Sequence, residues 1–575
     1  MDLTPPAPVA AERGWLRRLA HWIAALVACA VYLNALHNGF ALDDKVIVDQ
    51  NPLVHHLAAM RDIWVSAYWP NMPFQMGLYR PLTIAMYAVE WSLWHGQPMG
   101  FHALNVVLHA VVSALVVLLV LRLGAPPLAA AVGGVLFAIH PVHVEAVAGI
   151  VGRAEVVMTL FVLLACFLHL WRRGPVVARW VGIAVCFLAA LLTKESAVAL
   201  PLLLIIVDGL DPERRKPLWR TVWDDAPLYL LLAAIFGGYM GLRYAVLGVF
   251  SGSTLTPALR GASASTRIAT AISVWPQYLR LLVYPRDLVA DYGPNVLVVA
   301  HWGEPIVWMS LVLGVVVIGS AVLLRRRSPW WTAAVAWFVA GIFIVSNLVV
   351  PVGILLGERT LYLPSVALAF AAVPLVELGR RRPRLAVAVA ALALTLGVAR
   401  TWTRTPVWRT TDTVLTQLAS AHPESFYAQT YLGDEAVHAG HPHEAVRHYA
   451  KAWALAPYPV IGESYAYALV LIKDWPKAEQ VARASCSIEF PSPCLYVVDA
   501  LLAQGRPAAA RVLVDSIMPH VPPSEALIKR ALNVAQALHD TAGIAAAEQA
   551  MAALRPPPPA PAPAKKPAPA TPRRG

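Results

Sequence analysis

The chain has 575 residues, of which 58% are hydrophobic and 14% are charged, and its mean hydropathy is +0.58. A soluble domain usually carries roughly a quarter charged residues, so this composition excludes a wholly soluble protein. The net charge of +12 lies in short basic clusters between apolar runs. That pattern indicates membrane topology, and we set a nucleic-acid partner aside.

The first apolar run follows Arg17 and Arg18 and covers about residues 19–36. Positive residues stay on the cytoplasmic side of a membrane, so the tail of residues 1–16 is expected in the cytoplasm. The run has no small-residue cleavage site after it, which favours an uncleaved span over a removed signal peptide. Residues 39–100 are then expected to form a first external loop.

Further apolar runs predict about 11 spans in total between residues 17 and 402. The later spans are expected at residues 103–121, 128–140, 156–171, both halves of 180–210, 227–245, 306–324, 330–350, 361–378 and 385–398. The stretch 180–210 must form a hairpin with Lys194 and Glu195 near its outer tip, because a basic loop follows it. Residues 268–284 are only half apolar and are predicted to form an interfacial or re-entrant helix.

Residues 403–554 resemble a soluble protein on the external side, with a repeat of about 34 residues typical of tetratricopeptide helix pairs. The repeat positions are Leu432, Gly433, Gly440, Ala445, Tyr449, Ala452 and Pro457, then Ala466, Ala478 and Pro491, then Gly505 and Ala510. The alternative is a generic alanine-rich bundle. Cys486 and Cys494 can pair if this part is oxidised. The Pro/Ala-rich tail of residues 555–575 is expected to be disordered.

Two adjacent carboxylates, Asp43 and Asp44, come directly after the first span. Their mutual repulsion can raise one pKa toward a value suited to base catalysis, although a solvated loop start is the simpler interpretation. Arg80 follows in the same loop, and its planar fork suits a phosphate, with lipid-headgroup anchoring as the alternative.

Three more motifs fall at span ends that the same path assigns to the external side. His140, His143 and Glu145 have spacing that could suggest a metal, but Pro141 interrupts the local helix, and polar contacts to a ligand headgroup are favoured. Lys194 lies in an apolar segment, where ionisable residues are functional hypotheses by default and a structural ion pair is the alternative. The last motif pairs basic and aromatic residues in the run Glu358–Ser365.

Taken in order, the motifs resemble those of the transmembrane and tetratricopeptide-repeat-containing O-mannosyltransferases, which belong to the GT-C class of glycosyltransferases. The resemblance covers most of residues 35–370 and rests on Asp43-Asp44, Tyr79–Thr83, Phe101–Asn105 with His109, His140–Val147, Val151–Glu155, Lys194-Glu195 and Glu358–Ser365. It implies an all-α fold with a GT-C bundle in residues 17–402 and a repeat domain in 403–554.

By this resemblance Asp43 is the base that deprotonates the acceptor hydroxyl, and Asp44 orients the base or the sugar. Donor phosphate or sugar binding is implied for Arg80, His140, His143, Glu145, Arg153, Glu155, Lys194, Glu195, Glu358, Arg359 and Tyr362. The donor is a sugar on a polyprenyl phosphate, and transfer inverts the anomeric carbon. No cofactor or metal is expected if arginine and lysine neutralise the phosphate, and a divalent ion stays an open alternative.

The leading hypothesis is therefore transfer of a hexose, mannose by analogy, to a Ser/Thr hydroxyl of a protein on the outer face of a membrane. The composition looks bacterial, which implies an inner-membrane protein with a periplasmic repeat domain that meets the acceptor. A second hypothesis keeps the same core and changes the acceptor to an envelope glycan or lipid. A third makes the chain a non-catalytic membrane scaffold that presents its repeats to partners.

Overall fold

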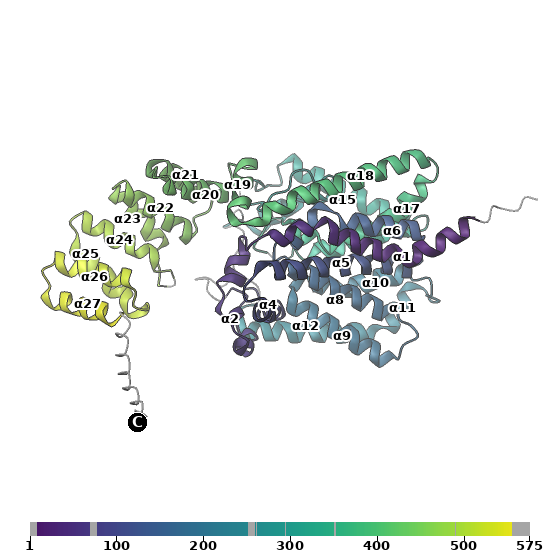
Figure 1. Ribbon diagram of the computed structural model, residues 1–575, viewed down its shortest axis with the longest axis horizontal. Coiled ribbons are helices and arrows are strands. Elements are labelled where there is room, and N and C mark those ends of the chain that lie inside the picture. The colour runs from purple at the N-terminus through teal and green to yellow at the C-terminus, as the bar shows by residue number, and fades with distance from the viewer. Residues whose placement is uncertain are drawn as a thin grey trace, which may run out of the picture. The chain divides into compact units, whose positions relative to one another are not determined.

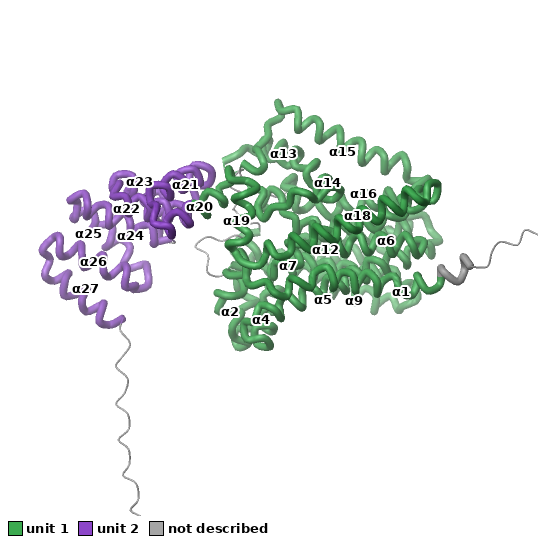
Figure 2. The backbone as a smooth tube through the Cα atoms, turned by 45° about the horizontal axis from the view of Figure 1, so that its top comes forward, with its two compact units in different colours: residues 1–432 green, residues 433–575 purple. Residues whose placement is uncertain are grey.

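The protein is described by a computed structural model over residues 8–69, 77–250, 259, 261–293, 295–349, 352–488 and 490–554, with side chains from Gly14 onward. The described residues form helices joined by loops (Figure 1), which confirms the predicted all-α fold. The chain divides into two compact units, residues 1–432 and 433–575 (Figure 2). The predicted tail of residues 555–575 lies outside the described residues.

Unit 1 contains an apolar helix at every position where a span is predicted. These helices are α1 (Pro8–Val31), α5 (Pro98–Arg122), α6 (Pro127–Ala138), α8 (Arg153–Leu170), α9 (Val176–Thr193), α10 (Leu200–Leu210), α12 (Ala226–Leu247), α15 (Pro305–Leu324), α16 (Pro329–Phe343), α17 (Ala367–Gly379) and α18 (Pro383–Arg404). By length and composition, seven helices in the described part are able to cross a membrane. The number is eight if the bent helix pair Pro127–Ala138 and Pro141–Ala148 forms a single span. The chain is an integral membrane protein, and the count of about 11 spans stays a prediction.

The centre of unit 1 is built on close contact between α1, α5 and α6. Ala20, Ala24 and Ala28 repeat every four residues along α1 and are completely buried. A Cβ atom at Gly134 of α6 would lie only 2.0 Å from Val117 of α5. Small side chains let helix backbones approach closely, which is how helices associate where lipid removes the hydrophobic driving force.

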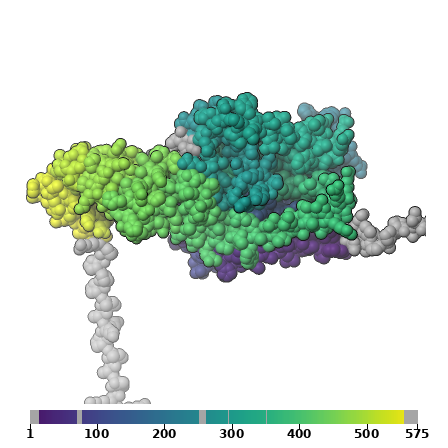
Figure 3. Space-filling view, turned by 90° about the horizontal axis from the view of Figure 1, so that it is seen from above, coloured from purple at the N-terminus to yellow at the C-terminus, as the bar shows by residue number. Residues whose placement is uncertain are grey.

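The outer helices of unit 1 expose their apolar side chains. Only 17% of the apolar stretch of α15 and 6% of the apolar stretch that includes α18 is buried inside the protein. Seen from above in Figure 3, these teal to green segments belong to the face turned toward the viewer. Helices that are apolar on all sides yet exposed are suited to contact with lipid tails.

Residues 268–284 and 180–210, for which the sequence predicts something other than a single span, are also helical. The segment predicted to be interfacial forms two short helices, α13 (Ala264–Ser273) and α14 (Trp275–Val283), and neither meets the length of a span. The hairpin prediction requires a helix break, and α9 indeed ends at Thr193 before an extended Lys194 with φ −160° and ψ 139°. The location of α13 and α14 at the membrane surface stays a prediction.

Unit 2 consists of stacked helix pairs, as the repeat prediction requires. Its helices are α21 (Pro442–Leu455), α22 (Pro459–Leu471), α23 (Trp475–Ser485), α24 (Ser492–Ala503), α25 (Pro507–Ile517), α26 (Glu525–Ala537) and α27 (Thr541–Ala553), and α20 (Phe426–His438) crosses the boundary between the units. A residue with positive φ forms the turn within each pair, namely Gly440, Lys473, Gly505 and His539. Stacked pairs bury apolar faces that one pair cannot bury alone, which confirms the tetratricopeptide-like solenoid. A disulfide joins Cys486 to Cys494.

Candidate active site

The two adjacent aspartates have different environments. Asp44 is 1% exposed, and its carboxylate accepts backbone N–H groups of Val151 (2.8 Å), Ile150 (3.2 Å) and Ala41 (3.3 Å). Burial raises the pKa of Asp44 to about 7, although these three donors oppose the shift. The side chain of Asp43 is 39% exposed. Asp44 therefore fastens the first loop to the turn before α8, and Asp43 is the accessible member of the pair.

The turn that Asp44 holds depends on two glycines. It connects α7 (Val144–Ala148) to α8. A Cβ atom at Gly152 would lie 2.5 Å from the carbonyl oxygen of Glu145, closer than real Cβ contacts come. A Cβ atom at Gly149 would lie 2.9 Å from the same oxygen. Glycine at both positions lets this backbone fold tightly enough to present its N–H groups to Asp44.

Arg359 lies between Asp43 and Glu145. Its backbone N–H donates to Glu145 Oε2 at 2.8 Å, and its Nε lies 3.4 Å from Glu145 Oε1. Its outer nitrogen NH1 donates to Asp43 Oδ2 at 3.3 Å. Burial opposes the charge of Arg359, but Glu145 and Asp43 raise its pKa above the ordinary value. The guanidinium is thus permanently charged beside the accessible aspartate.

Lys194 and Glu195 each form an ion pair with a different motif. Lys194 Nζ contacts Glu155 Oε1 at the start of α8. Glu195 Oε2 accepts hydrogen bonds from Arg80 Nε (3.2 Å) and NH2 (2.9 Å), and Glu195 Oε1 lies 3.7 Å from Arg243 NH1. The charges of Arg80, Lys194 and Arg359 act on one another. The structure therefore brings three separated basic motifs into one electrostatic neighbourhood.

Sequence reasoning missed Arg243 and Tyr68. Arg243 of α12 is 7% exposed, donates to the carbonyl of Gly77 and shares Glu195 with Arg80. The Tyr68 ring lies 5.1 Å from the Arg80 guanidinium. Arg243 carried the same signal as Lys194, an ionisable residue inside an apolar run. Tyr68 had no local signal, because its role depends on the approach of Arg80.

Other residues of the predicted set have their polar groups occupied within the protein. Arg153 is completely buried and contacts Glu90, Asn105 Oδ1 (2.6 Å) and the carbonyl of Phe101 (2.9 Å). The ring of His140 bonds the carbonyl of Leu282 through Nε2 (3.0 Å) and accepts the N–H of Val142 at Nδ1 (3.3 Å). Both residues brace the helices behind the Asp43 region.

His143 and Tyr362 form part of a buried polar and aromatic cluster. His143 Nε2 lies 2.7 Å from Ser365 Oγ, and the Tyr362 hydroxyl lies 2.7 Å from Nδ1 of His109. The His143 and Tyr362 rings are 4.7 Å apart. These side chains connect α5 and the segment before α17 with the chain after α6, so their observed role is in packing.

Glu358 is buried beside a tyrosine and an arginine. The Tyr292 hydroxyl donates to Glu358 Oε1 at 3.0 Å, and Arg404 NH2 lies 3.9 Å from the same oxygen. Burial raises the pKa of Glu358 to about 7, while Arg404 opposes the shift. Of the predicted residues, Asp43 and Glu145 pair with Arg359, Arg80 pairs with Glu195, and Lys194 pairs with Glu155.

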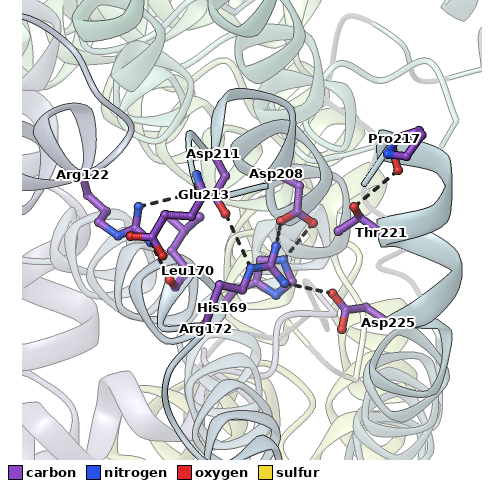
Figure 4. Close-up of polar contacts among 10 residues, drawn as sticks. All are labelled: Arg122, His169, Leu170, Arg172, Asp208, Asp211, Glu213, Pro217, Thr221 and Asp225. Carbon is purple, nitrogen blue, oxygen red and sulfur yellow. Dashed lines mark hydrogen bonds and ion pairs between the residues drawn. The ribbon is translucent and has the colours of Figure 1, made fainter. Parts of the chain in front are cut away.

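A second polar cluster lies at the other end of α8 (Figure 4). One ligand atom from each of His169, Asp208 and Asp225 lies within 4.8 Å of the others, the geometry of a possible metal site. Arg172 contacts Asp208 and lies 3.5 Å from Asp225, so a guanidinium supplies the cation there. The predicted alternative of a metal on His140, His143 and Glu145 lacks this convergence, because each of these side chains bonds elsewhere.

Comparison with known proteins supports the resemblance predicted from the motifs. A protein O-mannosyl-transferase of Drosophila melanogaster (Tmtc2) is 30% identical over 292 residues, 47% of this chain and 30% of its own length. A protein O-mannosyl-transferase of Caenorhabditis elegans is 25% identical over 442 residues, 74% of this chain and 61% of its own length. This chain is a sequence relative of the protein O-mannosyl-transferases.

The extent of these matches is limited. The chain spans 30% of the length of the Drosophila melanogaster relative, 61% of the Caenorhabditis elegans relative and 65% of human TMTC4, to which it is 24% identical. No family model matches the chain. A solved structure, the Cut9-Hcn1 hetero-tetramer of APC/C, covers 80% of this chain at 13% identity, with a TM-score of 0.23 that is too low to support a common fold.

Proposed function

We propose that this protein is an inverting membrane glycosyltransferase that moves mannose from a polyprenyl-phosphate donor to a Ser or Thr hydroxyl of a protein. The observation that carries the proposal is the accessible carboxylate of Asp43 in contact with Arg359, whose charge in turn acts on those of Arg80 and Lys194. The relatives are named protein O-mannosyl-transferases, which supports mannose as the sugar and a protein as the acceptor.

The proposed reaction is a single displacement. The acceptor hydroxyl oxygen forms a bond to the anomeric carbon on the face opposite the phosphate, and the bond from that carbon to the phosphate oxygen breaks. The hydroxyl proton passes to the carboxylate of Asp43, and polyprenyl phosphate leaves with the electron pair of the broken bond. One general base is sufficient for this chemistry, because the phosphate needs no protonation to leave when cations neutralise it.

The basic residues are arranged to receive that phosphate. Glu195 is shared between two arginines, Arg80 and Arg243, so this triad carries a net positive charge. Carboxylates hold the arginine forks in place before the donor arrives, which lowers the entropy cost of binding. In this proposal Glu155 and Glu195 position basic residues and do not contact the donor themselves.

The orientation in the membrane is part of the proposal. Basic clusters in the sequence support an external location for Asp43 and for the repeats of unit 2, and the composition supports a bacterial inner membrane. The disulfide between Cys486 and Cys494 is consistent with an oxidising compartment for unit 2. The stacked repeats of unit 2 then offer a surface for the acceptor protein on the side where transfer occurs.

The test is a transfer assay in membranes supplied with labelled polyprenyl-phosphate mannose and an acceptor. We expect Asp43→Asn to lose at least about a hundredfold in rate, since a positioned general base contributes roughly 10²–10⁴-fold. Asp62→Asn is the matched control, because Asp62 lies exposed in the same loop. Transfer by Asp43→Asn at the wild-type rate contradicts the assignment of the base.

Two further measurements separate the proposal from its alternatives. Mass spectrometry of envelope proteins and glycans from a deletion strain identifies the acceptor, and loss of mannose from a glycan or lipid alone contradicts a protein acceptor. Full rescue of the deletion phenotype by alanine at Asp43, Arg80 and Lys194 together contradicts catalysis and supports the scaffold hypothesis.

A further inference from the structure

Arg359 is held by Glu145 through its backbone and Nε and by Asp43 through its outer nitrogen. Glu145, which is 6% exposed, holds both the backbone N–H and the Nε of Arg359. The Arg359 side chain is 27% exposed and that of Asp43 is 39% exposed, so the contact of Arg359 with Asp43 is more open to solvent than its contact with Glu145. Motion of the outer nitrogens therefore leaves the contact between Glu145 and the backbone intact.

The contact between Arg359 and Asp43 is loose for an ion pair. Its distance is 3.3 Å, whereas charge-assisted N–H···O bonds are typically about 2.7–2.9 Å long. A guanidinium that holds a partly exposed carboxylate through one long hydrogen bond can exchange it for another anion.

Arg359 also interacts with two other cations. Its charge acts on those of Arg80 and Lys194, and this mutual repulsion favours the binding of an anion. A phosphate matches the planar fork of arginine at least as well as a carboxylate does. An incoming donor phosphate thus competes with Asp43 for the same nitrogens.

We propose that Arg359 exchanges Asp43 for the donor phosphate, so that donor binding frees the Asp43 carboxylate from its hydrogen bond. The proposal rests on the proposed function and adds an order of events, in which donor binding precedes the contact of Asp43 with the acceptor hydroxyl. Glu145 is the positioning residue of this exchange, since it fixes the part of Arg359 that does not move. Asp43 and the phosphate are alternative partners of one guanidinium.

A binding experiment tests the exchange without any transfer reaction. The probe is polyprenyl phosphate, and its dissociation constant is measured for detergent-purified full-length wild type, Asp43→Asn, Arg359→Gln and the double variant. We expect Asp43→Asn to bind the probe about 2- to 5-fold more tightly than wild type, since an exposed ion pair is worth up to about 1 kcal/mol and about 1.4 kcal/mol is tenfold. In the Arg359→Gln background the Asp43→Asn change is expected to have less than half this effect.

The double-mutant cycle separates exchange from simple removal of a negative charge. Tightening by Asp43→Asn of equal size with and without Arg359 overturns the exchange, because a general electrostatic effect does not need the arginine. Unchanged or weaker binding by Asp43→Asn also overturns it. Absence of probe binding by the wild type overturns both the exchange and the proposed donor, whereas binding without tightening overturns the exchange alone.

Glu145 is tested in the same assay. Glu145→Gln keeps the shape of the side chain and removes its charge, so we expect the coupling between Asp43 and Arg359 in the cycle to change at least twofold. Glu145→Asp, which keeps the charge, is expected to restore part of the wild-type coupling. Coupling that is identical in wild type and Glu145→Gln contradicts the positioning role, since a purely structural residue would alter stability without altering this coupling.

Discussion

Removal of one partner from the buried pair of Arg153 and Glu90 is expected to destabilise unit 1 strongly. Arg153 is completely buried, and its guanidinium contacts Glu90, Asn105 and the carbonyl of Phe101 and lies 5.0 Å from the ring of Tyr87. Glu90→Gln leaves the positive charge of Arg153 without a partner, and Arg153→Met leaves the negative charge of Glu90 without one. Breaking a buried pair in this way costs about 3–5 kcal/mol.

The double variant Glu90→Gln/Arg153→Met should cost much less than the sum of the two single changes. Neither charge remains to be desolvated in the double variant, so most of the penalty disappears. The measurement is reversible unfolding of the full chain in mixed detergent micelles, followed by circular dichroism for wild type, both single variants and the double variant.

An exposed pair in unit 2 provides the control. Arg511 and Asp515 lie one helical turn apart at 2.8 Å, with side chains 38% and 56% exposed. Removal of this ion pair by substitution of Asp515 is expected to lower the free energy of unfolding by less than about 1 kcal/mol, because solvent screens the interaction. Strict additivity at Glu90 and Arg153, or a cost there no larger than at the exposed pair, refutes the reasoning.

Three further outcomes are expected. Because the pKa of Asp44 is raised from 3.8 to about 7 by burial, the folded state keeps a proton that the unfolded state releases between these values. The free energy of unfolding should therefore fall as pH rises from 3.8 to about 7, and a pH series of unfolding curves should show a weaker fall for Asp44→Asn. Gly152→Ala should cost about 2 kcal/mol or more in the same unfolding assay, since its Cβ atom meets the carbonyl of Glu145, and an unchanged free energy contradicts the close approach. In intact cells, Cys486 and Cys494 should resist alkylation until a reductant is added, and labelling without reductant contradicts an oxidising location of unit 2.

Much of the fold could be predicted because its signals are local. Apolar runs correspond to helices in unit 1, and the helix break at Lys194 was required by the basic loop that follows α10. The repeat spacing predicted the helix pairs of unit 2. The number of spans could not be settled in this way, because α10 has 11 residues and α16 has 15, lengths shorter than a bilayer requires.

The candidate site was predicted less completely than the fold. Its motifs were found from residue types in sequence, and in the structure Arg359 contacts Asp43 while Arg80 and Lys194 pair with Glu195 and Glu155. Their individual roles remain proposals. Sequence reasoning grouped Arg153 and His140 with the donor-binding residues. In the structure Arg153 hydrogen-bonds Asn105 and His140 hydrogen-bonds the carbonyl of Leu282, both inside the bundle. Burial and partner choice cannot be derived from motif spacing.

The sequence by itself determined a membrane protein with apolar helices and a repeat solenoid, because hydropathy and periodicity are properties of neighbouring residues. Only the tertiary structure decided which acidic side chain pairs with which basic side chain. Glu145 and Arg359 are 214 residues apart, and Asp43 and Arg359 are 316 apart. These pairs form because the loop after α1, helix α7 and the segment before α17 meet in space. The same packing buries Asp44 and leaves Asp43 accessible. The two aspartates have the same side chain, and the approach of the turn at Ile150 and Val151 to Asp44 distinguishes them.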